Sequence, residues 1–445
     1  MKKFLLLAFF LLCFIHVGAQ IISTVAGGDS LGLGDGGPAI DAVIAGPIGI
    51  AIDGAGNIYI GDKGNNRIRK VNSSGIISTI AGTGAPGYLG DGAAATAALI
   101  NQPYGVAVDN AGNVYFADGN NNCIRKINTT GVIFTIAGIG GSHGYNGDNI
   151  AATTALLYAP CGITVDSTGN ILFTDGENNR IRKINTSGII TTIAGTGTAG
   201  NMGDNGQATA AEINTPYSIL LDAAGNLYIG EQYGGRVRKI SSTGIITTFA
   251  GTGTAGAIGD NGPATAAEIT HAEGLAMDAG GNLYISDEYN ERIRKVNASG
   301  TITTYAGDGI GDYNGDDIVA SAAQLDPAGL ALDAIGNLYI ADFGNHRIRR
   351  ITSTVVSVNN VNNVAEYALV YPNPTQRDFT IGITSAFDEQ ANVVITNTAG
   401  EQVKEFTTTT NKPLNVKLDE RTGMYFITVT TAHYTECKKL LVANP

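Results

Sequence analysis

The sequence predicts an all-β protein: a six-bladed β-propeller followed by a small β-sandwich domain. The first observation is a repeat, because the pattern of residues 49–62 recurs in recognisable form to residue 342. The second is composition, since 61 glycines and 15% charged residues are typical of many tight turns rather than long helices. One aspartate marks each copy at a period of about 56 residues, which indicates a repeat architecture: Asp53, Asp109, Asp166, Asp222, Asp278 and Asp333.

Each repeat contains four short segments with strand character. In the first copy they are residues 48–52, 57–60, 67–71 and 76–80, which are rich in β-branched residues with period-2 alternation. Gly, Asn, Asp and Ser separate them, as in tight turns. Each repeat is therefore predicted to be a four-stranded antiparallel meander, and six meanders arranged radially make a propeller.

The two ends of the array complement each other. Residues 21–28 match the fourth-strand pattern, and no first, second or third strand precedes them. The sixth copy ends with its third strand near Ile351. We therefore predict that the N-terminal strand completes blade six and covers its open edge.

The repeat also resembles a known family. Residues 103–109 read Pro-Tyr-Gly-Val-Ala-Val-Asp, and Gly112-Asn113, Asp118 and Ile124-Arg125 follow at fixed places, as in an NHL repeat. Residues 344–348 are closest to the namesake triplet of the family. The resemblance covers about residues 45–352. It implies a six-bladed propeller that usually serves as a binding platform, although a minority of relatives are enzymes, including a zinc-dependent lyase.

The segments on either side of the propeller predict export. Residues 1–19 have the charged start, apolar run and small residues of a signal peptide, and no other segment is long and apolar enough to span a membrane. The propeller is expected over residues 20–353 and a polar linker over residues 354–368.

Residues 369–445 are expected to form several short strands with turns between them. The Val-Tyr-Pro-Asn-Pro start at residues 370–374 and the Lys-Lys-Leu near the end resemble the C-terminal sorting domain of the type IX secretion pathway. The resemblance implies a β-sandwich that the export machinery recognises, and a secreted or outer-membrane location reached through the periplasm. A small adhesion-type sandwich is the alternative, and cleavage of the domain is left open.

Charge and cysteine content exclude several classes of function. The net charge of −12 argues against nucleic acid and against an anionic membrane surface. Cys13, Cys123, Cys161 and Cys437 make neither a disulfide scaffold nor a zinc-ligand pattern. A disulfide between Cys123 and Cys161 is left open. We expect a monomer.

Other patterns in the repeat are assigned to structure. The three Gly-x-Gly-x-x-Gly stretches lack the βαβ context of a dinucleotide site, so they are expected to be turns. Asp62 and its equivalents, with Glu231 in blade four, are expected to form structural ion pairs with the basic residues of the Arg-Ile-Arg-Lys runs. Loop carboxylates such as Asp204 and Asp260 are expected to cap the short helical turns that follow.

A calcium site is the alternative at one loop. Residues 308–317 are rich in oxygen ligands but lack the spaced ligands and final glutamate of an EF-hand. No cofactor is expected, with calcium at this loop as the exception. The candidate ligands are Asp308, Asp312, Asn314 and Asp316.

The candidate site lies on the face where the repeats differ. Positions just before the first-strand glycine, or the serine that replaces it in blade four, should ring the central mouth: Ile48, Tyr104, Cys161, Tyr217, Glu273 and Ala328. The turns between second and third strands differ at Lys63, Gly119, Gly176, Gln232, Glu288 and Phe343. Blades four and five thus gather the predicted ligand-binding residues Tyr217, Gln232, Tyr233, Glu273, Glu288 and Tyr289.

Two functions follow from these residues. Aromatic side chains beside acids and amides suit a glycan or protein ligand, so we expect an exported binding module rather than an enzyme. The alternative is a metal-dependent lyase or lactonase-like hydrolase at the mouth of the central channel. Histidines do not recur at equivalent positions, so three converging histidine ligands and a catalytic metal are not expected.

Overall fold

The computed structural model describes residues 20–28, 32–352, 367–371, 375, 377–384, 388–398, 400–418, 422–431 and 435–442. The predicted signal peptide and most of the predicted linker lie outside these residues. The chain divides into two units, Met1–Val356 and Ser357–Pro445. Within the described residues, regular structure consists of β-strands and short 3₁₀ turns, and no helix there is long and apolar enough to cross a membrane.

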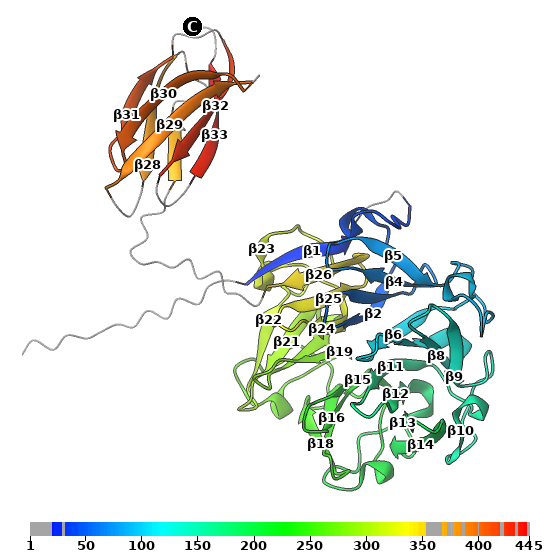
Figure 1. Ribbon diagram of the computed structural model, residues 1–445. Helices are drawn as coiled ribbons and strands as arrows, with labels where there is room; N and C mark the ends of the chain where they lie inside the picture. Colours follow the sequence, from blue (N-terminus) through cyan, green and yellow to red (C-terminus); the bar gives the residue numbers. More distant parts are fainter. Residues whose placement is uncertain are drawn as a thin grey trace, which may run out of the picture. The chain divides into compact units, whose positions relative to one another are not determined.

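The described residues of the first unit form six antiparallel sheets, which we call blades one to six, around a common axis (Figure 1). The first strands are β2 (Pro47–Ile52), β6 (Pro103–Val108), β11 (Pro160–Val165), β15 (Pro216–Leu221), β19 (Ala272–Met277) and β24 (Pro327–Leu332). The second strands are β3 (Ile58–Asp62), β7 (Val114–Asp118), β12 (Ile171–Asp175), β16 (Leu227–Glu231), β20 (Leu283–Asp287) and β25 (Leu338–Asp342).

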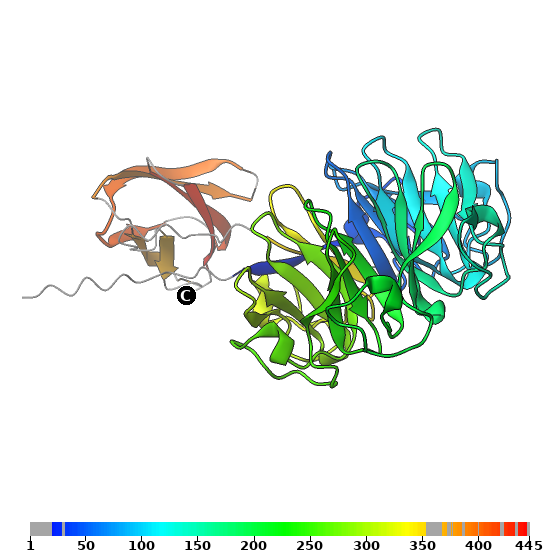
Figure 2. The same cartoon turned by 90° about the horizontal axis from the view of Figure 1, so that it is seen from below.

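The outer half of each blade continues the meander. The third strands are β4 (Arg67–Val71), β8 (Cys123–Ile127), β13 (Arg180–Ile184), β17 (Arg236–Ile240), β21 (Arg292–Val296) and β26 (Arg347–Ile351). The fourth strands of blades one to five are β5 (Ile77–Ala81), β9 (Ile133–Ala137), β14 (Ile189–Ala194), β18 (Ile246–Ala250) and β22 (Ile302–Ala306). Figure 2, turned by 90°, shows the blades side by side around the ring.

The fourth strand of blade six comes from the start of the chain. β1 (Ile21–Gly27) pairs antiparallel with β26, with Ile22 opposite Ile351 and Gly27 opposite Arg347. In Figure 1 blue β1 lies beside the yellow strands of blade six. The edge of β26 is therefore paired within the chain rather than open to another molecule. Two short strands add outer edges, β23 (Ile318–Val319) on β1 and β10 (Ile150–Ala151) on β14.

The first strands hold the ring together. Each contacts the first strands of both neighbouring blades, and β24 contacts β2, so the ring is closed. A side chain at Gly49 would collide with the backbone oxygen of Tyr104 in the next blade, and Gly329 is confined in the same way by Ile48. This close approach explains the glycine within the first strand of every blade except blade four. In blade four Ser218 replaces it, and its hydroxyl donates to the Ala272 carbonyl at 2.9 Å.

The hydrophobic core lies between adjacent blades. One cluster joins Tyr115 and Ile124 of blade two to Ile163, Phe173 and Ile184 of blade three, and similar clusters follow around the ring. The second strands are buried along their whole length, since each is covered by a neighbouring blade on both faces. Short 3₁₀ turns within the blade-to-blade segments each begin with a buried alanine: η1 (Ala39–Asp41), η2 (Ala95–Ala97), η4 (Ala152–Thr154), η6 (Ala208–Ala210), η7 (Ala264–Ala266) and η9 (Ala320–Ala322).

Each blade contains a fully buried arginine, and the predicted ion pairs of the strand-end acids are confirmed. The second arginine of the run, not the first, pairs with the strand-end acid: Arg69 lies 3.3 Å from Asp62. Arg69 also lies 2.9 Å from Asp35 of the blade-to-blade loop. It sits at the middle of β4, where acids from two directions can reach it, whereas Arg67 donates to the carbonyl of Asn65.

The loop carboxylates therefore do not cap the helical turns. Asp204 lies 2.6 Å from Arg238, and Asp260 lies 2.7 Å from Arg294. No side-chain cap hydrogen bond precedes the η6 or η7 turns. These acids balance a buried charge that would otherwise be costly to desolvate.

The C-terminal unit is a two-sheet sandwich. One sheet contains β27 (Tyr367–Tyr371), β28 (Asp378–Thr384) and β31 (Leu414–Lys417). The other contains β29 (Gln390–Asn397), β30 (Gln402–Thr409), β32 (Gly423–Thr430) and β33 (Thr435–Val442). Alternate residues of facing strands form one core, for example Ile381, Val393 and Ile427. β27 begins two residues before the predicted domain start at residue 369.

Candidate functional site

A β-bulge at the start of each first strand supplies one residue to the mouth of the ring. In blade five, Ala272 pairs with Asp287 and Gly274 pairs with Ser286, so Glu273 is the extra residue. Tyr217 holds the same place in blade four. The other first strands have register shifts at the corresponding position. Because a bulge re-aims its side chain, this repeated irregularity directs a variable residue toward the axis.

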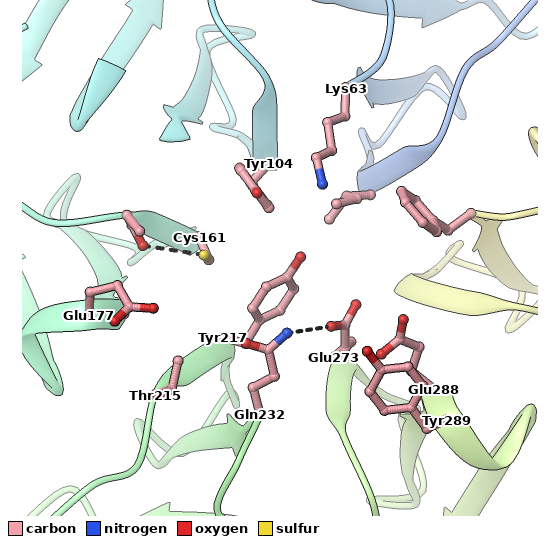
Figure 3. Close-up of a pocket in the computed structure, with 14 residues that line it drawn as sticks. Lys63, Tyr104, Cys161, Glu177, Thr215, Tyr217, Gln232, Glu273, Glu288 and Tyr289 are labelled. Atoms are coloured by element: carbon pink, nitrogen blue, oxygen red, sulfur yellow. Dashed lines mark hydrogen bonds between the residues drawn. The ribbon is translucent and has the colours of Figure 1, made fainter. Parts of the chain in front are cut away.

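The bulge residues of blades one to five line a cavity of about 260 Å³ at the mouth. The turns between second and third strands provide much of the remaining wall, and Figure 3 shows side chains from several blades pointing into it. The lining consists of Ile48, Lys63, Tyr104, Ala159, Cys161, Gly176, Glu177, Thr215, Tyr217, Gln232, Glu273, Glu288, Tyr289 and Phe343.

Most of the predicted ligand-binding residues come together in this cavity. Tyr217, Gln232, Glu273, Glu288 and Tyr289 all line it. Tyr233 is not part of the wall: it is 63% exposed on the rim. Its ring packs edge-on against His271, with centroids 5.2 Å apart. Ala328, at a predicted mouth position, is buried and is not part of the wall. Gly119, at a predicted turn position, has the Tyr104 ring directly beside it.

Two carboxyl groups lie together on the blade-five side. Gln232 donates from Nε2 to Glu273 Oε1 at 2.9 Å. Burial, and then the negative charge of Glu288, raises the pKa of Glu273 to about 8. Glu273 is thus held largely protonated at neutral pH, with the Glu288 side chain as its close acidic neighbour.

His271 belongs to the same cluster, although the sequence did not point to it. It lies at the end of the loop before β19, is 7% exposed, and has Nδ1 3.2 Å from Glu288 Oε2. The Tyr289 ring packs against it with centroids 4.1 Å apart. The only sequence signal was its register, two residues before Glu273. Because histidines do not recur at this position in the other blades, the repeat gives no reason to single out His271.

Lys63 brings the opposite charge to the cavity. It follows β3 in blade one, and its ammonium lies 4.8 Å from the centre of the Tyr104 ring and 5.3 Å from that of Phe343. Burial lowers the pKa of Lys63, while Glu273 and Glu288 act in the opposite direction. The rings of Tyr104 and Phe343 stabilise the Lys63 ammonium group without neutralising its charge.

One group in the described residues offers converging ligand atoms to a metal ion. His271, Glu273 and Glu288 present a nitrogen and carboxylate oxygens within 4.8 Å of one another. Imidazole with carboxylates suits zinc or a similar divalent ion. Such an ion would replace the proton held by Glu273 and use His271 in its neutral form.

In the structure, the candidate calcium ligands of residues 308–317 make other contacts. Asp316 lies 3.2 Å from Arg349 and accepts from the Thr24 backbone at 2.7 Å, so it is the blade-six counterpart of Asp35. Asn314 bonds to backbone groups of the same loop, at Ala322 and Gln324. Asp308 and Asp312 accept backbone N–H groups one or two residues on. Among the described residues, these loop acids do not form a group of converging ligand atoms.

The two cysteines that could have paired are both free and buried. Cys161 lies in the cavity wall and donates from Sγ to the Ala159 carbonyl at 3.3 Å. Cys123 begins β8, opposite Asp118. Burial, with a smaller contribution from Glu273, raises the pKa of the Cys161 thiol, so it is not activated as a nucleophile.

Comparison with known families agrees with this architecture. Residues 16–86, 84–146 and 140–202 match the Teneurin NHL domain, and residues 325–351 match the NHL repeat. The first unit is an NHL-repeat propeller. Residues 369–443 match the secretion system C-terminal sorting domain. The protein is therefore exported by type IX secretion, either to the cell surface or into the medium.

The curated relatives that match the chain are much longer proteins. Human Teneurin-4 is 29% identical over 355 residues, an alignment that covers 71% of this chain and 12% of Teneurin-4. Teneurin-m of Drosophila melanogaster is 28% identical over 279 residues, an alignment that covers 55% of this chain and 10% of Teneurin-m. The chain thus spans only a small part of the length of these relatives.

Solved structures share the fold at lower identity. A protein of unknown function from Bacteroides thetaiotaomicron has a TM-score of 0.55 at 20% identity, covering 75% of this chain and 76% of that chain. An auxiliary nutrient binding protein from the same organism has a TM-score of 0.55 at 15% identity, with the same coverage. At this identity the likeness concerns the fold alone.

Proposed function

We propose that this exported NHL propeller is a binding module that holds a glycan or protein ligand in the cavity at its mouth. The observation that carries the proposal is the composition of the cavity wall. The scaffold repeats the same residues in every blade, yet the bulge and turn positions differ, and in blades four and five they bring tyrosines, an amide and two carboxyl groups together. Variable side chains on a rigid, repeated frame are typical of binding surfaces.

The geometry supports recognition of a partly apolar, partly polar ligand. Tyr104 and Tyr217 meet edge to face with ring centroids 6.0 Å apart, which leaves parts of both rings facing the cavity. Gln232 and the carboxyl pair add hydrogen-bonding groups beside them. Ring faces next to polar groups suit both sugar rings and peptide side chains.

A metal-dependent lyase or lactonase-like hydrolase is the second candidate function. The cluster of His271, Glu273 and Glu288 favours it, because these groups could hold a divalent ion beside the cavity. Calorimetric titration of the metal-free protein with zinc and with calcium tests this alternative. Tight, stoichiometric binding that is lost in His271→Ala would favour the enzyme, whereas millimolar or absent binding would favour the binding module.

The binding module is tested with glycan and peptide arrays and the purified full chain. Any ligand found is then titrated against Tyr289→Ala, Tyr233→Ala and a control, Leu89→Ala, which removes a 67% exposed side chain outside the cavity wall. Loss of Tyr289 or Tyr233 should weaken binding by about 2 kcal/mol, since aromatic anchors dominate such sites. Both tyrosines are 63% exposed, so thermal stability should change little. Unchanged affinity in both variants would place the site elsewhere.

A further inference from the structure

The cavity carries charges of opposite sign on different blades. Lys63 comes from blade one, while Glu273 and Glu288 come from blade five. Figure 3 shows the Lys63 ammonium pointing into the cavity from one side and the two carboxyl groups on another. After burial, the groups that act on the pKa of Lys63 are Glu273, Cys161 and Glu288. The cavity therefore has a positive end at Lys63 and a negative end at Glu273 and Glu288.

The positive end is unsatisfied. In the part of the chain that the structure describes, no ion pair and no hydrogen bond is found for Lys63 Nζ, whose neighbours there are the rings of Tyr104 and Phe343. An ammonium group has three donors, and aromatic faces replace its lost hydration only in part. A ligand anion at this point would supply the missing acceptors.

The negative end is prepared for a cation. Gln232 holds one oxygen of Glu273, and His271 lies against one oxygen of Glu288. These contacts fix the two carboxyl groups and leave further acceptor positions facing the cavity. The Tyr289 and Tyr217 rings stand beside them in the wall, and aromatic rings next to carboxylates are well suited to an organic ammonium group.

The size of the cavity limits the ligand. At about 260 Å³ it lies below the usual range for drug-sized molecules, roughly 300 to 1,000 Å³. A neutral sugar would leave both charged ends without counter-charges. A small ligand that carries an anion and a cation would satisfy both ends at once, and each charge would add to specificity.

We infer that the cavity takes a zwitterionic ligand, an amino acid or a short peptide, with its carboxylate at Lys63 and its ammonium group at Glu273 and Glu288. This inference rests on the proposed binding function and narrows it to one chemical class. It predicts that the protein distinguishes a free amino acid or peptide from the same compound with a blocked terminus.

The test uses the purified full chain and a panel of the standard amino acids and their glycyl dipeptides, screened by saturation-transfer NMR. The tightest compound is then titrated calorimetrically beside its N-acetyl and C-amide derivatives. Each blocked derivative should bind at least tenfold more weakly than the free compound. Equal binding of free and blocked forms, or no binding by any free compound at millimolar concentration, overturns the inference.

Two variants assign each end of the ligand. Lys63→Met should weaken the free compound at least tenfold and leave the C-amide unchanged. Glu288→Gln, which removes the negative charge beside the protonated Glu273, should weaken the free compound and leave the N-acetyl form unchanged. Lys70→Met removes a lysine that packs on Tyr59 away from the cavity, and Glu268→Gln removes a carboxylate outside the wall, so both controls should bind as the unmodified protein does. Variants that weaken free and blocked forms alike would contradict the assignment.

The inference and the proposed function can fail separately. If a neutral glycan binds, and Tyr289→Ala abolishes that binding while no amino acid or peptide binds, the binding function stands and the zwitterion assignment is wrong. If neither class binds, both proposals are wrong.

Discussion

Replacing Glu273 with glutamine should change how stability depends on pH. Glu273 is 8% exposed, and burial together with Glu288 raises its pKa from 4.5 to about 8. The unfolded chain loses this proton near pH 4.5, whereas the folded protein keeps it until about pH 8. The stabilising contribution is therefore fully present below about pH 4.5 and is lost as the pH rises through about 8.

The size of the effect follows from the shift. Each pKa unit corresponds to about 1.4 kcal/mol, so ionising Glu273 lowers the free energy of unfolding by an amount on the order of 5 kcal/mol between about pH 4.5 and 8. Glutamine resembles the protonated carboxyl group, because its oxygen can accept from Gln232 and its amide can donate to Glu288. The variant should match the unmodified protein near pH 5 and exceed its stability at pH 9.

Differential scanning calorimetry of the full chain at pH 5, 7 and 9 measures this difference. Calorimetry is suitable because two units unfold and a single two-state transition is not expected. Glu268→Gln controls for the loss of a carboxylate elsewhere in blade five. Parallel pH profiles for Glu273→Gln and the unmodified protein, or lower stability of Glu273→Gln at pH 9, would show that Glu273 is already ionised and solvated at neutral pH.

Three further predictions follow from the fold. Arg125→Met leaves the buried Asp118 carboxylate without its ion-pair partner and should lower the free energy of unfolding by about 3 to 5 kcal/mol, measured from the calorimetric transition. A second change, Asp118→Leu, should recover part of this loss. Deleting residues 20–28 exposes the edge of β26 and should cause aggregation, seen by light scattering; a monomeric deletion variant would refute the role of β1 as an edge cover. Ending the chain at residue 365 removes the sorting domain and should leave a folded propeller in the periplasm, measured by cell fractionation; normal surface delivery would contradict this.

The regular part of the molecule was readable from the sequence because the repeat supplies its own alignment. Six copies of one pattern define which positions are turns and which are strands. The turn aspartates illustrate this: Asp53 accepts the backbone N–H groups of Ala55 and Asn57, both at 2.9 Å, as its place in a Gly-rich turn predicts. The same register showed that the residues before the inner glycine should face the mouth, and Glu273 and Tyr217 do so.

Interactions between distant segments were decided by the tertiary structure. Asp35 and Arg69 are 34 residues apart, and only the path of the blade-to-blade loop brings them into contact. Lys63 and Glu273 meet the same cavity from blades on different parts of the ring, so no local spacing relates them. In the folded protein His271 contacts Glu288, Tyr233 and Tyr289. An alignment of the repeats does not place these residues beside it.

The physical reason lies in what a repeat specifies. Strand alternation and turn chemistry are local, so the sequence by itself determined the meanders, the order of blades and the face that varies. The cavity depends on how far the ring closes and on which side chains the bulges turn inward, and these are properties of packing between blades. The contacts of the loop acids with the buried arginines and the contact between Glu273 and Glu288 therefore came from the tertiary structure alone. The same holds for the position of Lys63, for which the described residues show no ion pair.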